Sequence, residues 1–401
     1  MPMTVPVLDL TSEHAALRPA LDAAIARVLD SGQLVLGVEV EAFEAEAAAY
    51  LGAGHAVGLN SGTDALVIGL RALGIGPGDE VITSPFSFFA TSEAIQLVGA
   101  VPVFVDLAED SFTLDAGLVE AALTARTAAI VPVHLYGDAV PMGALLALAE
   151  RHGLRLLEDA AQAFGARYPD RCVGCRCGLG SAEAPASAAQ EAATGGGAAT
   201  ASPLAGRRLG TLGDAGAVSF YPTKNLGALG DAGLLVSDDA ALVAFARRLR
   251  NHGSERRYEH ETLGYNSRLD ALQAAALRVK LPHLDAWNVT RRRLAARYDA
   301  GLADLPDLVL PPASSEHVYH QYTVRIGAGR RDHVAAALRR AGVGTAVHYP
   351  TTLERYGGRV HGDLSRARAA AATVLSLPLY PSLGEARQDY VIEVLRSVLG
   401  A

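Results

Sequence analysis

The chain has 401 residues, of which 50% are hydrophobic and 19% are charged, so it can bury a large core and is long enough for two domains. A net charge of −8 argues against nucleic acid or an anionic membrane as the main partner. Apolar runs are interrupted before they reach membrane-spanning length, and residues 1–10 lack the pattern of a secretion signal, so we expect a soluble, cytoplasmic protein.

Residues 56–236 alternate short apolar runs with amphipathic segments. The apolar runs predict buried strands over Val81–Ser84, Val101–Val105, Ala129–Val133 and Leu154–Leu157. The segments between them predict helices over Asp64–Leu73, Thr91–Val98, Leu114–Leu123 and Pro141–Arg151. This alternation predicts an α/β fold whose largely parallel sheet is covered on both faces, with ligands beyond the carboxyl ends of the strands.

Residues 170–205 interrupt this pattern with a composition dominated by Gly, Ala, Ser and Thr, which predicts a disordered surface insertion. The insertion begins with Cys172, Cys175 and Cys177. An odd number of closely spaced cysteines is a poor disulfide framework. A structural zinc site needs four ligands and no second Cys/His pair stands nearby, so we predict no metal site.

After a strand over residues 217–220, a helical pattern runs from Arg268 to about Asp299 and breaks at Pro282. The rest of the chain predicts a strand over Tyr319–Ile326 and helices over Asp332–Ala341 and Ala369–Leu375. We therefore predict a large domain over residues 1–284 and a smaller C-terminal α+β domain over residues 285–401.

Only two of the 35 lysines and arginines are lysines, Lys224 and Lys280. Lys224 lies in a glycine-punctuated run, Gly213–Gly233. Lysine, unlike arginine, can become the neutral amine that condenses with a carbonyl, although a solvated loop lysine is the alternative interpretation. Lys280 lies at helical spacing, and we expect it to extend along a helix face toward solvent.

Two further patterns complement the amine. Glu158 and Asp159 follow a predicted strand, where an acid is either functional or a helix cap. Residues 60–66, Asn-Ser-Gly-Thr-Asp-Ala-Leu, place small residues at a predicted helix start, where free N–H groups bind anions such as phosphate but also occur as ordinary caps. An amine, an acid and a phosphate site are what pyridoxal phosphate requires, and Ser219 could add a hydroxyl to the phosphate.

These residues stand in motifs that resemble the DegT/DnrJ/EryC1/StrS family of fold-type I, pyridoxal-phosphate-dependent sugar aminotransferases. The motifs are Asn60–Leu66, Phe88–Thr91, Glu158–Gly165, Ser219–Leu226, Arg250–Gly253, Gly264–Asp270, His348–Pro350 and Leu375–Pro378. The resemblance runs from about Leu34 to Leu383. It excludes the insertion, which lengthens the spacing between Asp159 and Lys224 relative to the family and which we expect to lie outside the site.

The resemblance implies a role for each matched residue. Lys224 would form a Schiff base with the cofactor and move the proton, and Asp159 would pair with the pyridine nitrogen. The implied cofactor-binding residues are Gly62, Thr63, Phe88, Asp159, Gln162, Ser219, Lys224 and Asn266. In this set Phe88 would stack on the ring, Gln162 would bind the ring hydroxyl, and Asn266 would reach the phosphate of the other subunit of a homodimer.

The same resemblance implies aminotransfer from L-glutamate to a keto sugar carried on a nucleotide. Substrate-side residues would be Tyr221, His320, His348 and Tyr349, although core or hinge packing is an equally open role for the last three. Lys224 argues against related dehydratases, which carry histidine there.

Residues 227–233 resemble the branch that acts on 3-keto sugars, which implies a dTDP-3-keto-6-deoxyhexose as substrate. A 4-keto sugar or cyclitol aminotransferase and a non-catalytic regulatory relative remain alternatives. A nicotinamide-dependent oxidoreductase does not fit, because no Gly-x-Gly-x-x-Gly follows the first strand.

Overall fold

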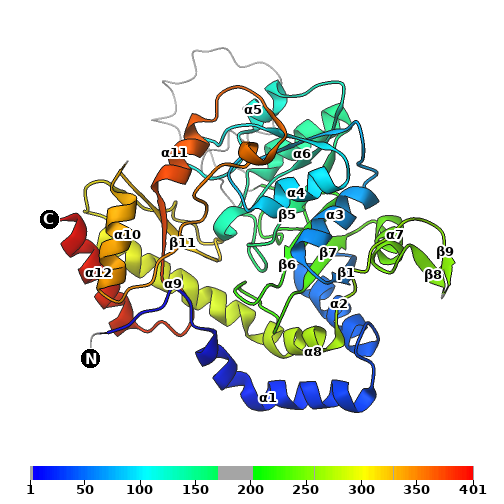
Figure 1. The fold of residues 1–401 in the computed structure, drawn as a ribbon, viewed down its shortest axis with the longest axis horizontal. Coiled ribbons are helices and arrows are strands. Elements are labelled where there is room, and N and C mark those ends of the chain that lie inside the picture. The colour runs from blue at the N-terminus through cyan, green and yellow to red at the C-terminus, as the bar shows by residue number, and fades with distance from the viewer. Residues whose placement is uncertain (1–2, 170–201, 257, 328, 401) are drawn as a thin grey trace.

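An eight-stranded sheet in the order β1-β7-β6-β5-β4-β2-β3-β12 forms the centre of the protein (Figure 1). Its strands are β1 (His55–Leu59), β2 (Glu80–Thr83), β3 (Val101–Phe104), β4 (Thr127–Val131), β5 (Arg155–Asp159), β6 (Ala215–Ser219), β7 (Gly233–Ser237) and β12 (Arg359–Val360). Strand β7 runs antiparallel to both of its neighbours, and the other pairs in this sheet are parallel. The predicted largely parallel sheet is confirmed.

The computed structural model describes residues 3–169, 202–256, 258–327 and 329–400. Most of the predicted insertion, with Cys172, Cys175 and Cys177, lies outside the described residues. Its predicted last four residues, 202–205, instead form a turn in which the Ala205 N–H donates to the Ser202 carbonyl over 2.9 Å. Leu204 in this turn packs against the core, so the predicted insertion extends too far.

Two hydrophobic cores lie on the two faces of the central sheet. One face is covered by α2 (Val38–Leu51), α5 (Ala116–Ala121), α6 (Met142–His152) and α8 (Ala271–Lys280). The other is covered by α3 (Gly62–Ala72), α4 (Phe89–Leu97) and α7 (Ala240–Arg250). Neighbouring residues of β6, Ala217 and Val218, belong to different cores because successive side chains of a strand point to opposite faces.

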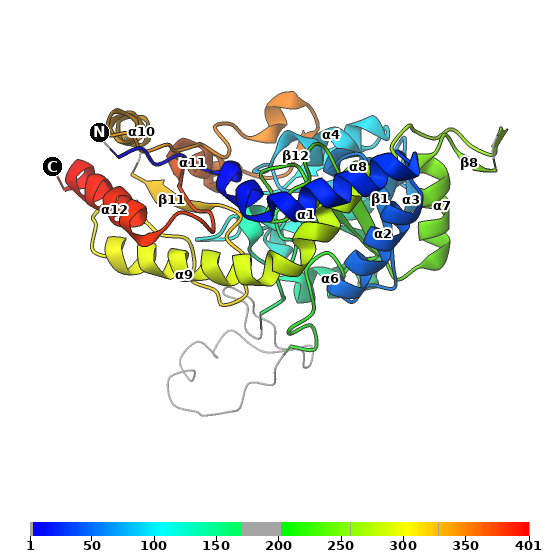
Figure 2. The same cartoon turned by 90° about the horizontal axis from the view of Figure 1, so that it is seen from below.

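The C-terminal part of the chain builds a second layer around a three-stranded antiparallel sheet. Its strands are β10 (Leu308–Val309), β11 (Tyr322–Ile326) and β13 (Val374–Leu377), and its helices are α9 (Leu284–Leu302), α10 (Arg331–Arg340), α11 (Ser365–Thr373) and α12 (Glu385–Leu399). Shorter elements are η1 (Leu135–Gly137), η3 (Leu281–His283), η4 (Leu353–Tyr356), β8 (Ser254–Arg256) and β9 (Glu259–His260). The long helix α1 (Leu10–Ser31) lies along α8 (Figure 2).

The predicted break at Pro282 is confirmed, since η3 separates α8 from α9. The predicted helix over Ala369–Leu375 is wrong at its end, because α11 stops at Thr373 and the next residues form β13. Leu375 and Leu377 are buried there and pair with Val324 and Tyr322 of β11. Pairing with a buried strand outweighs the helical propensity of the alanine-rich residues before it.

The predicted division at residue 284 falls at the start of α9 and stays a prediction. Two segments cross it. Val5 forms a bridge to Val343 and is buried in the C-terminal core, so the N-terminus lies close to the C-terminus in both views (Figures 1 and 2). From the other direction, β12 adds to the edge of the central sheet beside β3.

Candidate active site

A cavity of about 530 Å³ opens beyond the carboxyl ends of β5 and β6, at the edge of the sheet where the fold predicts ligands. Among the residues that line it are eleven that the sequence singled out: Gly62, Thr63, Phe88, Asp159, Gln162, Ser219, Tyr221, Lys224, His320, His348 and Tyr349. Strands and loops that are far apart in the sequence thus bring all of the predicted site residues except Asn266 to one cavity.

One end of the cavity is built to hold an anion. Ser61 caps α3, its Oγ accepting from the Asp64 N–H over 3.1 Å, while the N–H groups of Gly62 and Thr63 at the first turn have no partner within the helix. A Cβ on Gly62 would lie 2.5 Å from Cβ of Ser219, so only glycine allows this approach. The helix N-terminus and the Ser219 hydroxyl could therefore hold a phosphate.

Asp159 is the last residue of β5 and is 5% exposed. The Thr91 hydroxyl donates to its Oδ2 over 2.7 Å, and the Ala161 N–H donates to its Oδ1 over 3.2 Å. Burial raises the pKa of Asp159, while these two hydrogen bonds and the charge of Lys224 act against the rise. Because burial disfavours the ionised form of Asp159, a cation bound beside it in the cavity would be stabilised by the carboxylate and would keep it ionised.

Thr91 was part of a predicted motif, but sequence reasoning gave it no role. It lies in the first turn of α4, where its hydroxyl also contacts the Ser87 hydroxyl at 2.8 Å. Since Ser87 can donate to Thr91, the Thr91 proton stays directed at Asp159. The position of Thr91 four residues after Ser87 is a weak signal for this pair, and nothing in it points to Asp159.

Lys224 lies in the loop that follows β6 and is half-buried. Among the described residues its Nζ makes no hydrogen bond. Burial lowers the pKa of Lys224 from 10.5 to about 8, and the charge of Asp159 opposes that shift. The neutral amine is therefore accessible near neutral pH, which is the property that a condensing lysine needs.

Another part of the cavity wall carries aromatic and amide side chains. Gln162 accepts from the Tyr136 N–H over 2.6 Å and donates through Nε2 to the Tyr349 hydroxyl over 3.0 Å. Phe88 is 57% exposed, and its ring centroid lies 5.9 Å from that of Tyr349. An exposed ring at the mouth of a cavity could stack on a flat ligand ring.

Two histidines complete this wall. His320 Nδ1 lies 3.2 Å from Oδ1 of Asn225, and His348 Nδ1 lies 2.9 Å from Oγ of Ser376. Burial lowers the pKa of His348 to about 4, and burial together with the charge of Lys224 holds the pKa of His320 well below its usual range. Both rings are therefore neutral at physiological pH.

Glu158 does not belong to the cavity, because consecutive strand residues point to opposite faces. Its carboxylate accepts from Nε2 of His134 over 2.8 Å and from the N–H groups of residues 210, 212 and 213. Burial acts against ionisation, but these bonds outweigh it and lower the pKa of Glu158. Of the predicted acid pair, Asp159 lines the cavity and Glu158 anchors the loop before β6. Sequence reasoning missed His134.

Asn266 is exposed and lies outside the cavity of its own chain, paired through a backbone bridge with Asn251. The expectation for Lys280 is wrong, because its side chain is fully buried rather than extended toward solvent. Its Nζ lies 2.9 Å from Oε1 of Glu13 and donates to the Gly227 carbonyl over 2.9 Å. Packing of α1 over α8 covers this lysine.

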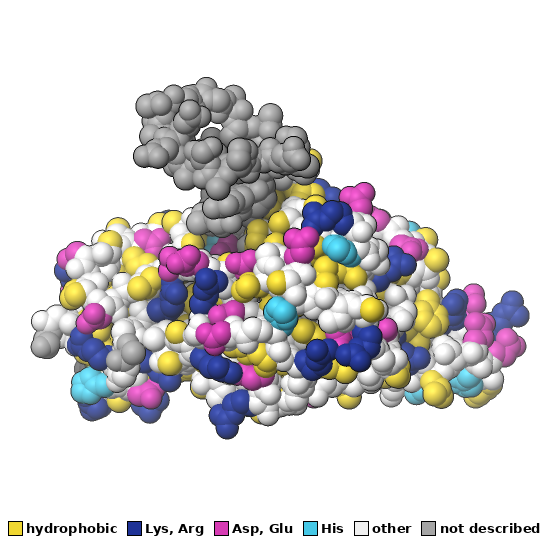
Figure 3. All heavy atoms as spheres, turned by 90° about the horizontal axis from the view of Figure 1, so that it is seen from above, with side chains coloured by type: hydrophobic (Ala, Val, Ile, Leu, Met, Phe, Trp, Pro, Cys, Tyr) yellow, Lys and Arg dark blue, Asp and Glu magenta, His cyan; other side chains and the backbone are white. Residues whose placement is uncertain are grey.

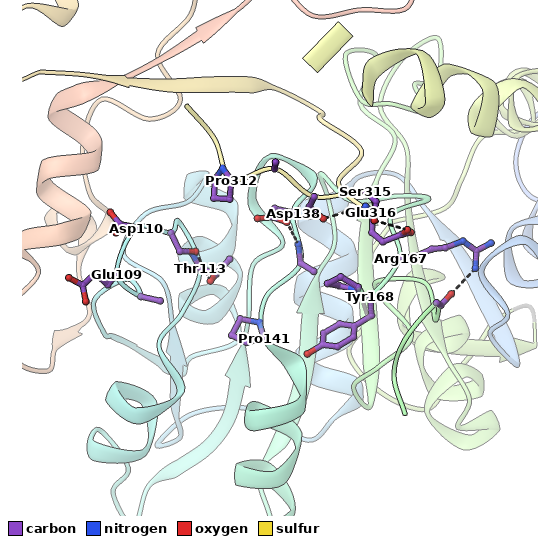
Figure 4. Close-up of a pocket in the computed structure, with 17 residues that line it drawn as sticks. Glu109, Asp110, Thr113, Asp138, Pro141, Arg167, Tyr168, Pro312, Ser315 and Glu316 are labelled. Atoms are coloured by element: carbon purple, nitrogen blue, oxygen red, sulfur yellow. Dashed lines mark hydrogen bonds between the residues drawn. The ribbon is translucent and has the colours of Figure 1, made fainter. Parts of the chain in front are cut away.

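A cavity of about 550 Å³ lies on the surface between the loops around Asp110, Asp138, Arg167 and Glu316 (Figure 4). None of the predicted site residues lines it. Three of these four side chains are acidic, and Arg167 donates to the Gly206 carbonyl over 2.6 Å. Without an amine or an anion-binding helix end, it lacks the chemistry of the cavity around Lys224.

On the face shown in Figure 3, side chains of Lys and Arg are interspersed with those of Asp and Glu. Within the described ranges, none of the helices combines the length and the apolar composition needed to cross a bilayer.

Comparison with known proteins places this geometry in context. The model of the DegT/DnrJ/EryC1/StrS aminotransferase family matches residues 16–183 and 189–396. A dTDP-3-amino-3,4,6-trideoxy-α-D-glucose transaminase of Streptomyces venezuelae is 46% identical over 98% of this chain and 95% of its own. A UDP-N-acetyl-3-dehydro-α-D-glucosamine 3-aminotransferase of Acidithiobacillus ferrooxidans is 42% identical over 98% of each. The crystal structure of S. venezuelae DesV with a ketimine intermediate superposes with a TM-score of 0.87 at 45% identity, covering 100% of both chains.

Proposed function

This chain belongs to the DegT/DnrJ/EryC1/StrS aminotransferase family, and we propose that it transfers the amino group of L-glutamate to a nucleotide-linked 3-keto sugar. It is a pyridoxal-phosphate-dependent sugar aminotransferase. The observation that carries the proposal is the meeting of Lys224 and Asp159 in one cavity, although 65 positions separate them in the sequence.

The residues of the cavity fit pyridoxal phosphate. The first turn of α3 and Ser219 would hold the phosphate, because glycine at position 62 lets the helix start approach Ser219 closely enough for both to reach one anion. Asp159, held by Thr91, would keep the proton on the ring nitrogen. When bound, the cofactor supplies an electron sink that lets an amine and a carbonyl exchange.

The other side chains of the cavity would orient the bound molecules. Lys224, with a pKa near 8, would condense with the cofactor, would accept the proton from the amino-bearing carbon of glutamate, and would later donate a proton to the former carbonyl carbon of the sugar. Phe88 would cover the ring, and the second N–H of Gln162 Nε2 would reach the ring hydroxyl. Tyr221, His320, His348 and Tyr349 would face the sugar nucleotide.

A 3-keto, 6-deoxy sugar on dTDP is the substrate we propose. The names of both relatives locate the amino group at C-3, one on a dTDP sugar and the other on a UDP sugar. The dTDP relative has the higher identity, which supports dTDP. A 4-keto sugar or a cyclitol is the alternative for the same chemistry.

We further propose a homodimer in which Asn266 completes the phosphate site of the other subunit. Asn266 is exposed and outside its own cavity, which is the arrangement that a residue serving another subunit requires. Loss of activity in Asn266→Ala, restored in mixed dimers with Lys224→Ala, would test this sharing of sites. Cytoplasmic location stays a prediction.

The proposal is tested by separating its two half-reactions. Purified protein loaded with pyridoxal phosphate should show a visible absorption band that borohydride bleaches and that glutamate converts in a single turnover. A panel of dTDP- and UDP-linked 3-keto and 4-keto sugars then follows. Transfer only to a 4-keto sugar or a cyclitol refutes the 3-keto assignment, and glutamate conversion without transfer to any acceptor favours a regulatory relative.

A further inference from the structure

The hydrogen bonds around Asn225 determine which nitrogen of His320 carries the proton. Asn225 is buried, and its Nδ2 donates to the Val318 carbonyl over 3.0 Å. A carbonyl oxygen can only accept, so the orientation of the amide is fixed and Oδ1 faces His320. His320 Nδ1, 3.2 Å from that oxygen, must therefore donate.

A neutral imidazole with its proton on Nδ1 has a lone pair on Nε2. Burial keeps the ring neutral, and the neighbouring positive charges of Lys224 and Arg291 act in the same direction. Among the described residues Nε2 has no hydrogen-bond partner, and His320 lines the cavity around Lys224. This wall thus offers a hydrogen-bond acceptor that the fold itself does not use.

Tyr349 supplies the complementary group. Its oxygen accepts from Gln162 Nε2, so its own hydrogen is free to be donated, and no acceptor for it lies among the described residues. Burial raises the pKa of Tyr349, with Asp159 adding to the rise, so the hydroxyl keeps its proton. His320 and Tyr349 therefore present an acceptor and a donor to the cavity that contains Lys224.

We propose that His320 and Tyr349 together select an α-hydroxy ketone, with Nε2 of His320 accepting from the sugar hydroxyl and Tyr349 donating to the adjacent carbonyl oxygen. A ketone only accepts and its neighbouring hydroxyl donates, which is the pattern that the two side chains complement. This inference rests on the proposed function and adds the feature of the sugar that the enzyme requires. His320 is then a residue that determines specificity.

The tautomer can be measured without any substrate. Nitrogen NMR of the protein labelled with ¹⁵N-histidine, with the His320 signals assigned through His320→Gln, should show a protonated Nδ1 and an unprotonated Nε2 at neutral pH. A proton on Nε2 would overturn the inference, because that nitrogen could then only donate.

The second test compares a keto nucleotide sugar with its analogue in which the hydroxyl beside the carbonyl is replaced by hydrogen. The wild type should prefer the hydroxylated sugar by about 10- to 100-fold in kcat/KM, the usual cost of leaving a buried polar group unpaired. His320→Leu should bring this ratio close to one, and His320→Gln, which keeps an acceptor, should restore part of it.

Tyr349→Phe is the matched control, because both sugars keep the carbonyl. It should slow both sugars and preserve their ratio. A ratio near one in the wild type, or a ratio that survives in His320→Leu, overturns the inference while leaving the proposed function intact. A wild type that transfers to neither sugar contradicts the proposed function instead, and the NMR result then decides the tautomer independently.

Discussion

The two lysines of this chain stand in opposite environments. Lys280 is fully buried, with Glu13, the Gly227 carbonyl and Nε2 of His14 around its Nζ. Lys224 is half-buried beside the cavity, and its Nζ has no hydrogen-bond partner among the described residues. One amine is held as a structural cation, and the other is left available for chemistry.

The difference shows that burial alone does not make a lysine reactive. A buried amine that contacts an acid and a carbonyl has its hydrogen bonds satisfied, and its removal would leave the acid without a partner. An amine that is desolvated without hydrogen bonds has a lowered pKa and gives up its proton more readily, as is the case for Lys224. Since Gly227 lies three residues after Lys224, the structural lysine also fixes the loop that carries the reactive one.

Exchange of each lysine for arginine should give the largest difference between the two positions. Lys224→Arg should lose about 10⁴-fold or more in kcat, because a guanidinium has no accessible neutral amine. Lys280→Arg keeps the charge and should retain activity while losing about 1–3 kcal/mol of stability through overpacking. Steady-state kinetics and thermal unfolding of both variants measure this, and equal losses of activity would contradict the assigned roles.

Replacement of each lysine by methionine compares their contributions to stability. Lys280→Met leaves the Glu13 carboxylate without its partner and should cost about 3 kcal/mol. Lys224→Met removes a desolvated, unpaired amine and should not destabilise the cofactor-free protein. Denaturant unfolding of the cofactor-free variants provides the measurement. If Lys224→Met proves the less stable of the two, the comparison fails.

Much of the local structure and the main site residues could be predicted from the sequence. Each of the four strands and four helices predicted between Asp64 and Leu157 begins and ends within two residues of the observed element. Their hydrophobic periods are strong because both faces of the sheet are buried. Lys224 could be singled out because lysine is rare in this chain, whereas Asp159 and Gly62, whose patterns also occur as ordinary caps, were assigned through the family resemblance.

What could not be predicted depends on contacts between distant parts of the chain. Thr91 donates to a residue 68 positions later, and Lys280 binds an acid of α1, an element for which the sequence analysis made no prediction. The role of His134 depends likewise on Glu158, across two neighbouring strands. Composition and periodicity describe one segment at a time, so they cannot identify the partner of a buried polar group when that partner lies in a distant segment.

The smallest expected effect, and the most direct measure of the difference between the lysines, is the pH dependence of cofactor capture. Only a neutral amine condenses, so the rate at which the cofactor-free protein captures pyridoxal phosphate should rise with pH, with a midpoint near the Lys224 pKa of about 8. At pH 7 such an amine is neutral about 300 times more often than a lysine of ordinary pKa.

The direction in which Asp159 shifts the Lys224 pKa gives a further prediction. Since the charge of Asp159 raises the Lys224 pKa, Asp159→Asn should move the midpoint below that of the wild type. Lys280→Met, the control, should leave the midpoint in place. Borohydride trapping followed by mass spectrometry should find the label on Lys224, and a midpoint close to 10, or label on Lys280, would show that the two environments do not differ in the way their contacts require.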